Sequence, residues 1–151
     1  MYEPCRWNTQ CIVYDNSVAK ENGIPIAIET CGIGSRDFYK KCAELGTTFL
    51  YDIKCLNSIR HKALTGVDNT HILSNLQYLM GNGADIILRL PLIPDCNDSD
   101  EDIAKLSAFL KENKGNYRYA EIMAYHSLGV GKAEKLGTSA NYIHNNATVE
   151  E

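Results

Sequence analysis

Two oppositely charged residues stand close together at the end of an apolar run. The run is Phe49-Leu50-Tyr51, and Asp52 and Lys54 follow it. Residues i and i+2 of a β-strand point to the same side, so we expect the carboxylate and the ammonium to project together. One interpretation is a local ion pair at a strand end, which has little energetic consequence. The other is a binding site, because parallel α/β folds bind ligands at the carboxyl ends of their strands.

Other apolar runs also end in residues that can bind ions. Glu29 and Thr30 follow the run 24–28, and Arg89 and His126 stand at the ends of two later runs. If these runs are parallel strands, their ends meet at one edge of the sheet and form a charged site. Strand ends are also where polar residues ordinarily begin, so a structural interpretation stays open.

Three chemistries are compatible with this edge. Lys54 in a desolvated barrel mouth could form a Schiff base, as in aldolase-like lyases. Lys54 and Arg89 could instead bind an anionic cofactor. Asp52 with Glu29 could hold a cation. The spacing of these residues does not choose among the three.

The apolar periodicity predicts strands that alternate with helices. The expected strands span 24–28, 48–54, 84–90 and 117–124, and the expected helices span 12–22, 35–46, 69–81 and 99–115. This alternation is typical of an α/β fold with a parallel sheet and right-handed crossovers. Residues 55–68 and 91–95 are expected to be connections, and the two prolines make the second of them stiff.

Several side chains carry more specific expectations. Asn69 is expected to cap the helix over 69–81. Ile103 falls on the apolar stripe of the helix over 99–115 and is expected to be buried. His61 and His71 lie in or beside helical segments and are expected to face solvent.

The composition indicates a soluble globular domain without a cationic field. The chain has 151 residues, 44% of them apolar, and a net charge of -4. This charge disfavours nucleic acid and anionic membranes as partners, and no apolar run is long enough to span a bilayer. The six cysteines have irregular spacing and form no C-x-x-C pair. They are interpreted as reduced thiols of a cytoplasmic protein, and the first residues lack the pattern of a signal peptide.

Several short sequence motifs resemble those of the radical SAM proteins that activate glycyl radical enzymes, such as pyruvate formate-lyase activating enzymes. They occur in the same order along the chain. The motifs are Ile28–Gly32, Leu50–Lys54, His61-Lys62 with Leu64–Val67, Arg89–Pro94 with Asn97-Asp98, and Tyr125-His126 with Gly129, Lys132, Leu136 and Gly137. The similarity covers roughly positions 23 to 137. It predicts a domain over 1–137 and a polar tail over 138–151.

The resemblance implies a partial (β/α) barrel and a cofactor chemistry. In this family a reduced [4Fe-4S] cluster passes an electron to S-adenosylmethionine, and the radical that forms takes hydrogen from a glycine of the partner enzyme. A flavodoxin-type protein is the expected electron donor, in an anaerobic cytoplasm. Lys54, Arg89 and His126 are implied to contact S-adenosylmethionine. Glu29, Thr30 and Asp52 are implied to line a monovalent cation site beside it.

The sequence also departs from the family pattern. The C-x-x-x-C-x-x-C motif is absent, and Cys5 and Cys11 are too few and wrongly spaced to replace it. The family's glycine-rich motif that ends in Glu-Pro is also missing, and Glu3-Pro4 could be its remnant. We therefore expect a chain that lacks the first βα units and performs no radical chemistry alone. Two alternatives stay open, a clusterless paralogue that binds S-adenosylmethionine or a partner, and a Schiff-base lyase that uses Lys54.

Overall fold

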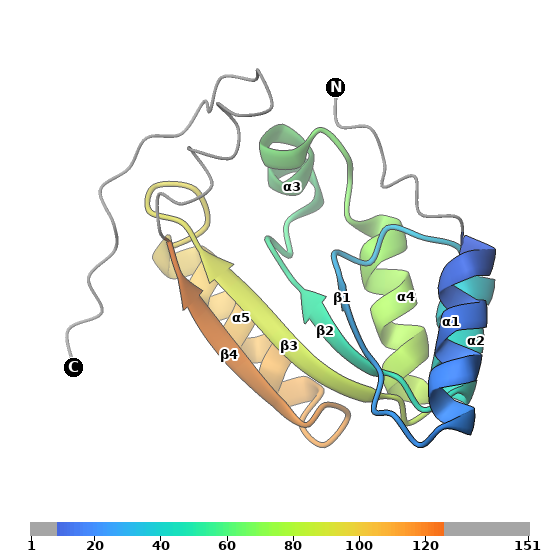
Figure 1. The fold of residues 1–151 in the computed structure, drawn as a ribbon. Helices are drawn as coiled ribbons and strands as arrows, with labels where there is room; N and C mark the ends of the chain where they lie inside the picture. The colour runs from blue at the N-terminus through green and yellow to red at the C-terminus, as the bar shows by residue number, and fades with distance from the viewer. Residues whose placement is uncertain (1–8, 126–151) are drawn as a thin grey trace.

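The computed structural model describes residues 9–125, with side chains from residue 15 onward (Figure 1). The elements in chain order are α1 (Thr9–Glu21), β1 (Ala27–Thr30), α2 (Arg36–Glu44), β2 (Thr48–Asp52), α3 (Ser58–Thr65), α4 (Thr70–Gly81), β3 (Asp85–Leu92), α5 (Asp100–Glu112) and β4 (Tyr119–Ala124). None of the helices in this part of the chain is long and apolar enough to cross a membrane. The predicted boundary between residues 137 and 138 lies outside the described residues and stays a prediction.

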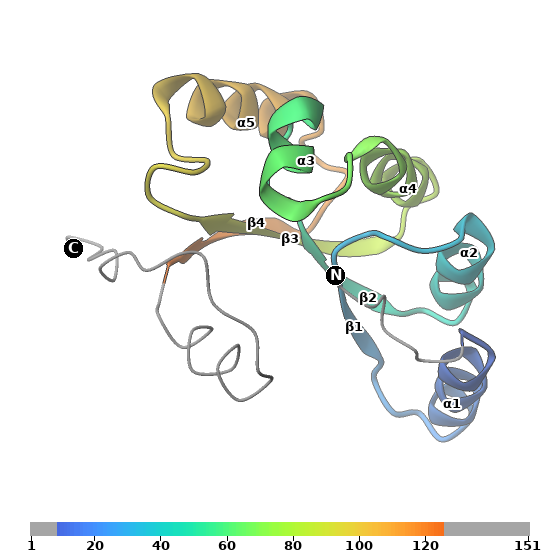
Figure 2. The ribbon, with the colours of Figure 1, turned by 90° about the horizontal axis from the view of Figure 1, so that it is seen from above.

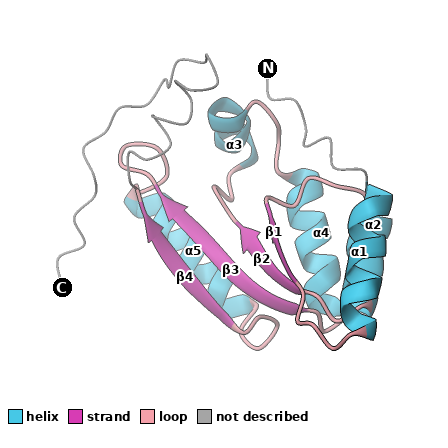
Figure 3. Cartoon of the chain, in the orientation of Figure 1, coloured by secondary structure: helices cyan, strands magenta, loops and turns pink. Residues whose placement is uncertain are grey.

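The four strands form one parallel sheet in the order β1-β2-β3-β4. Each strand reaches its neighbour through a helical connection, as parallel pairing requires. Seen from above in Figure 2, the sheet is curved and α2, α4 and α5 lie along its convex side. Helix α1 lies beside α2, next to the edge formed by β1 (Figures 1 and 3). The predicted α/β fold, with the parallel strands of a partial barrel, is confirmed.

The core lies between the sheet and these helices. The fully buried strand residues alternate along the chain, as Phe49 and Tyr51 do in β2 and Ile86 and Leu88 do in β3. They pack with residues of α2 and α4, of which Leu76 is fully buried. Burying a side chain of this size contributes about 1.5–3 kcal/mol, so this layer supplies most of the stability of the sheet.

The opposite side of the sheet, which we call the open face, carries charged residues. Strand alternation places Glu29 of β1, Asp52 of β2, Arg89 of β3 and Glu121 of β4 there. Asp52 pairs in register with Arg89, and Arg89 pairs with Glu121. The apolar and charged residues of each strand are therefore sorted onto two different sides of the sheet.

The connection over 55–68 contains a helix that the apolar pattern did not predict. Helix α3 begins after Asn57, whose side chain accepts a hydrogen bond from the Arg60 N–H, and it ends at Gly66 with a left-handed φ of 86°. These are ordinary start and stop signals. The apolar periodicity is weak because Ile59 is exposed while His61 is buried.

The prediction that His61 faces solvent is wrong, whereas His71 is exposed as expected. The Nδ1 atom of His61 lies 2.8 Å from the Val67 carbonyl oxygen, in the turn that follows α3. The imidazole can be buried because it forms a hydrogen bond with this carbonyl. A single polar contact of this sort does not change the apolar periodicity, so the sequence did not predict it.

Strand β3 continues through Pro91 and Leu92, which were expected to lie in a loop. The Arg89 carbonyl accepts a hydrogen bond from the Ile53 N–H, so residues 89 and 91 both face β2. Pro91 has no N–H to give to the Ile53 carbonyl, so the β2–β3 ladder stops at this point. Pairing with β4 continues through Pro91 and Leu92.

Two helix predictions also need correction. Asn69 stands at the start of α4 but makes no side-chain cap bond, because its amide donates to the carbonyls of Cys55 and Leu56. In α5, Leu106, Phe109 and Leu110 pack against the core as expected, whereas Ile103 is 41% exposed. Ile103 lies in the first turn of α5, on a pocket wall that it shares with Ile122 of β4.

Candidate functional site

Arg89 is the centre of the charged group on the open face. Its guanidinium forms an ion pair with the Glu29 carboxylate, and its Nε lies 3.3 Å from a carboxylate oxygen of Glu121. The Arg89 side chain is 16% exposed, whereas that of Glu29 is 65% exposed. Strands β1, β3 and β4 are thus joined by one cation, which offsets the mutual repulsion of the carboxylates around it.

Asp52 is the member of this group with a buried oxygen that lacks a hydrogen bond within the described part of the chain. Its Oδ1 atom is buried and has no hydrogen-bond partner among the described residues. Burial raises the pKa of the Asp52 carboxyl, and the positive charges of Lys54 and Arg89 act in the opposite direction. A buried carboxylate oxygen without a partner fits a site that receives a cation or a hydrogen-bond donor from a ligand.

Lys54 lies beyond the end of β2, and its side chain is exposed. Its ammonium is close enough to Asp52 to lower the carboxyl pKa. The predicted pairing of Asp52 and Lys54 at the end of β2 therefore corresponds to an electrostatic interaction at the carboxyl edge of the sheet.

Thr30 is not brought to the same side as its neighbours. Its hydroxyl lies 2.8 Å from the Tyr39 hydroxyl in the helix layer and accepts a hydrogen bond from the Gly32 N–H. Burial raises the pKa of Tyr39 to about 12, so this phenol stays protonated at neutral pH. Glu29 and Asp52 share the open face, whereas the Thr30 hydroxyl lies behind the sheet. His126 lies outside the described residues.

The described cysteines do not form a cluster site. Cys31, Cys42, Cys55 and Cys96 are free thiols, as the sequence predicted. Burial raises the pKa of the Cys42 thiol to about 11, which disfavours the thiolate that binds metal. No group of three metal-binding side chains occurs in the part of the chain with described side chains. These residues do not fit a [4Fe-4S] cluster, which needs three thiolates.

Sequence reasoning missed two residues of this edge. Glu121 lies in β4, and only the register of β4 with β3 shows that it reaches Arg89. Asn97 carries a hydrogen bond from the loop after β3 to the Lys54 carbonyl. Asn97-Asp98 is one of the segments that resemble the family, but the resemblance does not reveal this contact.

The chain is similar to several activating enzymes. It is 40% identical over 123 residues to the choline trimethylamine-lyase activating enzyme of Oleidesulfovibrio alaskensis, covering 80% of this chain and 40% of that protein. It is 36% identical over 122 residues to the trans-4-hydroxy-L-proline dehydratase activating enzyme of Clostridioides difficile, with the same two shares. It is 36% identical over 127 residues to the pyruvate formate-lyase-activating enzyme of Streptococcus mutans, covering 80% of this chain and 48% of that protein.

The chain belongs to the family of glycyl-radical-enzyme activating proteins. It spans less than half the length of these relatives. No protein-family model matches it. A crystal structure of a domain of pyruvate-formate lyase-activating enzyme from Bacteroides vulgatus shares its fold, with a TM-score of 0.72 and 19% identity, over 88% of this chain and 89% of that one. The family predicted from the sequence motifs is thus confirmed.

For this family member we expect Asp52→Asn to stabilise the unliganded chain at neutral pH. The native pKa of Asp52 is raised, so the folded state binds this proton more tightly than the unfolded state. Stability is therefore lost as the pH rises from about the unfolded pKa of 3.9 through the raised native pKa. The gain in Asp52→Asn should be on the order of 1 kcal/mol above that window and vanish below it.

Urea denaturation at several pH values measures this difference. Asp98→Asn is the matched control, because Asp98 is exposed and its substitution should change stability little. A loss of stability in Asp52→Asn at pH 7 would contradict the interpretation of Asp52 as an unsatisfied carboxylate.

Proposed function

We propose that this chain is part of a radical SAM activating enzyme and binds S-adenosylmethionine at the carboxyl edge of its sheet. The observation that carries the proposal is the buried, unpartnered Asp52 Oδ1 atom beside the cations of Lys54 and Arg89. The family relationship supports the choice of ligand, since the relatives are activating enzymes. S-adenosylmethionine has a carboxylate, an ammonium and a sulfonium, which match a site of mixed charge.

The residues divide their roles by charge. Lys54 and Arg89 would hold the carboxylate of the ligand, and His126 would contribute a further contact. Glu29 and Asp52 would supply the side-chain oxygens of a monovalent cation site beside the ligand, with Thr30 at the same strand end. When bound together with a reduced cluster, S-adenosylmethionine supplies the radical that removes a hydrogen atom from a glycine of the partner enzyme.

The cluster ligands are not among the described residues, and the partner is a separate protein. Because the described cysteines do not fit a cluster, we propose that this chain alone is inactive and that the whole protein works in the cytoplasm with a flavodoxin-type donor. Its partner would be a glycyl radical enzyme. The relatives carry the names of activating enzymes for choline trimethylamine-lyase, trans-4-hydroxy-L-proline dehydratase and pyruvate formate-lyase, so the partner class is proposed without choosing one of them.

A clusterless binding module is the second candidate. The absence of a three-ligand metal group within the described side chains favours it, and it would use the same residues for S-adenosylmethionine. The Schiff-base lyase has less support. Lys54 is exposed, whereas a Schiff-base lysine is activated by desolvation or by a second cation.

Calorimetric titration of the chain with S-adenosylmethionine tests the proposal. Lys54→Ala should weaken binding about 10- to 100-fold, the scale of a lost hydrogen bond between charged groups. Lys114→Ala is the control with the same change of charge. Lys114 is exposed in the turn after α5, at the end of the sheet where the strands begin. Equal affinity for Lys54→Ala and the unmodified chain would exclude the proposed site.

A further inference from the structure

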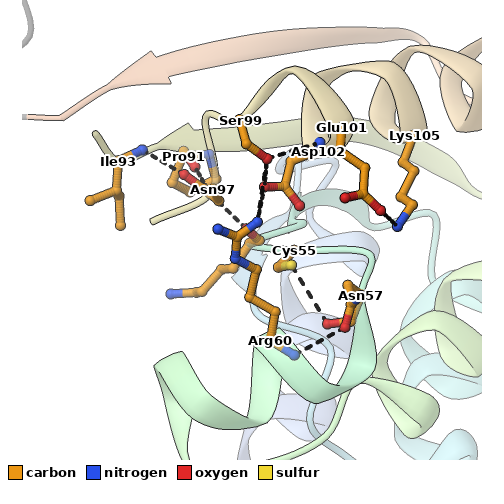
Figure 4. Close-up of polar contacts among 11 residues, drawn as sticks. Cys55, Asn57, Arg60, Pro91, Ile93, Asn97, Ser99, Glu101, Asp102 and Lys105 are labelled. Carbon is orange, nitrogen blue, oxygen red and sulfur yellow. Dashed lines mark hydrogen bonds and ion pairs between the residues drawn. The ribbon is translucent and has the colours of Figure 1, made fainter. Parts of the chain in front are cut away.

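The side chain of Asn97 joins the segment after β2 to the segment after β3. Its Nδ2 donates hydrogen bonds to the carbonyls of Lys54, at 2.6 Å, and Pro91, at 2.7 Å. Its Oδ1 accepts one from the Ile93 N–H at 2.7 Å. Figure 4 shows Asn97 beside Pro91 and Ile93 with these contacts dashed. Both amide donors are therefore used on backbone carbonyls.

The place of Asn97 follows from where the β2–β3 ladder stops. The bond from the Ile53 N–H to the Arg89 carbonyl, at 2.8 Å, follows the end of β2. The next position of the ladder would need an N–H from Pro91, which has none. Beyond this point the carbonyls of Lys54 and Pro91 have no partner in the β2–β3 ladder, and the Asn97 amide donates to both. On the β3 side, Asn97 bonds the Pro91 carbonyl and the Ile93 N–H, the two groups that a further residue of β2 would have paired with.

A second asparagine continues this arrangement along the chain. Asn69, which is 3% exposed, donates from Nδ2 to the carbonyls of Cys55 at 2.9 Å and Leu56 at 3.0 Å. Three successive carbonyls, those of residues 54–56, are therefore held by two side-chain amides. The Lys54 side chain is exposed, so its starting direction is set by this backbone.

We propose that Asn97 is a positioning residue that fixes the backbone from which Lys54 projects toward its ligand. The inference rests on the proposed function, because it assigns Lys54 to S-adenosylmethionine. Asn97 does not touch the ligand; it acts through Lys54. Asn97 orders the backbone of residues 54–56 before the ligand binds, so the Lys54 ammonium already lies near Asp52. Less conformational entropy is then lost on binding, and the affinity is higher.

Other contacts hold the same region together, so a variant at Asn97 can keep the fold. Arg60 of α3 forms an ion pair with Asp102 of α5, and it lies 3.4 Å from the Ser99 hydroxyl (Figure 4). The hydrophobic core does not include Asn97. We therefore expect substitution of Asn97 to change the order of residues 54–56 more than the global stability.

The sharpest variant is Asn97→Asp, which keeps the size of the side chain. It replaces the two donors with an oxygen that faces the carbonyls of Lys54 and Pro91. The dissociation constant for S-adenosylmethionine should rise about tenfold. Asn113→Asp is the matched control, since Asn113 Nδ2 donates to the Phe109 carbonyl at 2.8 Å at the far end of α5. Asn97→Ala adds no charge and should weaken binding in the same direction.

A double-mutant cycle separates positioning through Lys54 from other effects. In a Lys54→Ala background, Asn97→Asp should change the dissociation constant less than twofold. A full tenfold effect in that background would overturn the inference. NMR relaxation gives a readout independent of the ligand, because the backbone order parameters of residues 54–56 should fall from about 0.85 to below 0.6 in Asn97→Asp.

These two readouts distinguish the inference from the function beneath it. If Lys54→Ala leaves S-adenosylmethionine binding unchanged, the proposed function fails, whereas reduced order at residues 54–56 in Asn97→Asp would still support positioning of Lys54. If Asn97→Asp leaves those order parameters unchanged, the positioning role is wrong even where Lys54 binds the ligand.

Discussion

Replacing Gly32 by alanine should destabilise the fold by about 2–5 kcal/mol. Gly32 has a left-handed φ of 82°, which costs a residue with a Cβ about 1–2 kcal/mol. A Cβ there would lie 2.1 Å from the Tyr51 hydroxyl oxygen, 2.6 Å from the Tyr51 Cζ and 2.9 Å from a methyl carbon of Ile72. Overpacking of a tight core adds about 1–3 kcal/mol.

The surroundings of Gly32 cannot easily move away. Tyr51 is fully buried and donates a hydrogen bond to the Ile72 carbonyl at 2.7 Å. The buried Asn75 amide holds the carbonyls of Gly32 and Gly34, each at 3.0 Å. The loop after β1 is therefore clamped to α4 just beyond Glu29 and Thr30, so the substitution should also disturb the charged edge.

Urea denaturation of Gly32→Ala measures the loss. Gly46→Ala is the matched control, because Gly46 has a similar φ of 79° and no atom within 4 Å of an added Cβ. It should cost only the backbone part, about 1–2 kcal/mol. Equal losses in the two variants would show that contact with Tyr51 contributes nothing.

Phe49→Ala should cost about 3–5 kcal/mol of stability, the usual range for a buried aromatic residue. Phe49 is fully buried and packs on Tyr39 of α2, with ring centroids 6.1 Å apart. Its neighbour Leu50 points to the open face and is only half-buried. Leu50→Ala should therefore cost clearly less, about 1–2 kcal/mol.

Denaturation of the two variants shows which side of β2 carries the core. The pair is well matched, because both substitutions truncate an apolar side chain in one strand at adjacent positions. A loss in Leu50→Ala as large as that in Phe49→Ala would mean that the open face is covered in solution. That result would argue against a ligand reaching Arg89 and Asp52 from this side.

The sequence by itself determined the order of the strands and of the described helices other than α3, and the edge at which we propose the site. Apolar runs such as Ile86–Leu88, together with the Ser35 and Ser99 caps, are local signals that need no partner. Parallel strands bring their carboxyl ends to one edge by geometry alone, so Glu29, Asp52 and Arg89 could be grouped without coordinates. The ordered motifs then indicated the family.

Only the tertiary structure decided which of these residues share a partner. Thr30 and Glu29 are neighbours in sequence, yet strand alternation and the Tyr39 hydroxyl place the Thr30 hydroxyl behind the sheet. Glu121 reaches Arg89 because of the β3–β4 register. Asn97 reaches Lys54 across 43 positions of sequence, where β2 has ended and Pro91 has no N–H. Such contacts depend on register and on unpaired backbone groups, which no local pattern records.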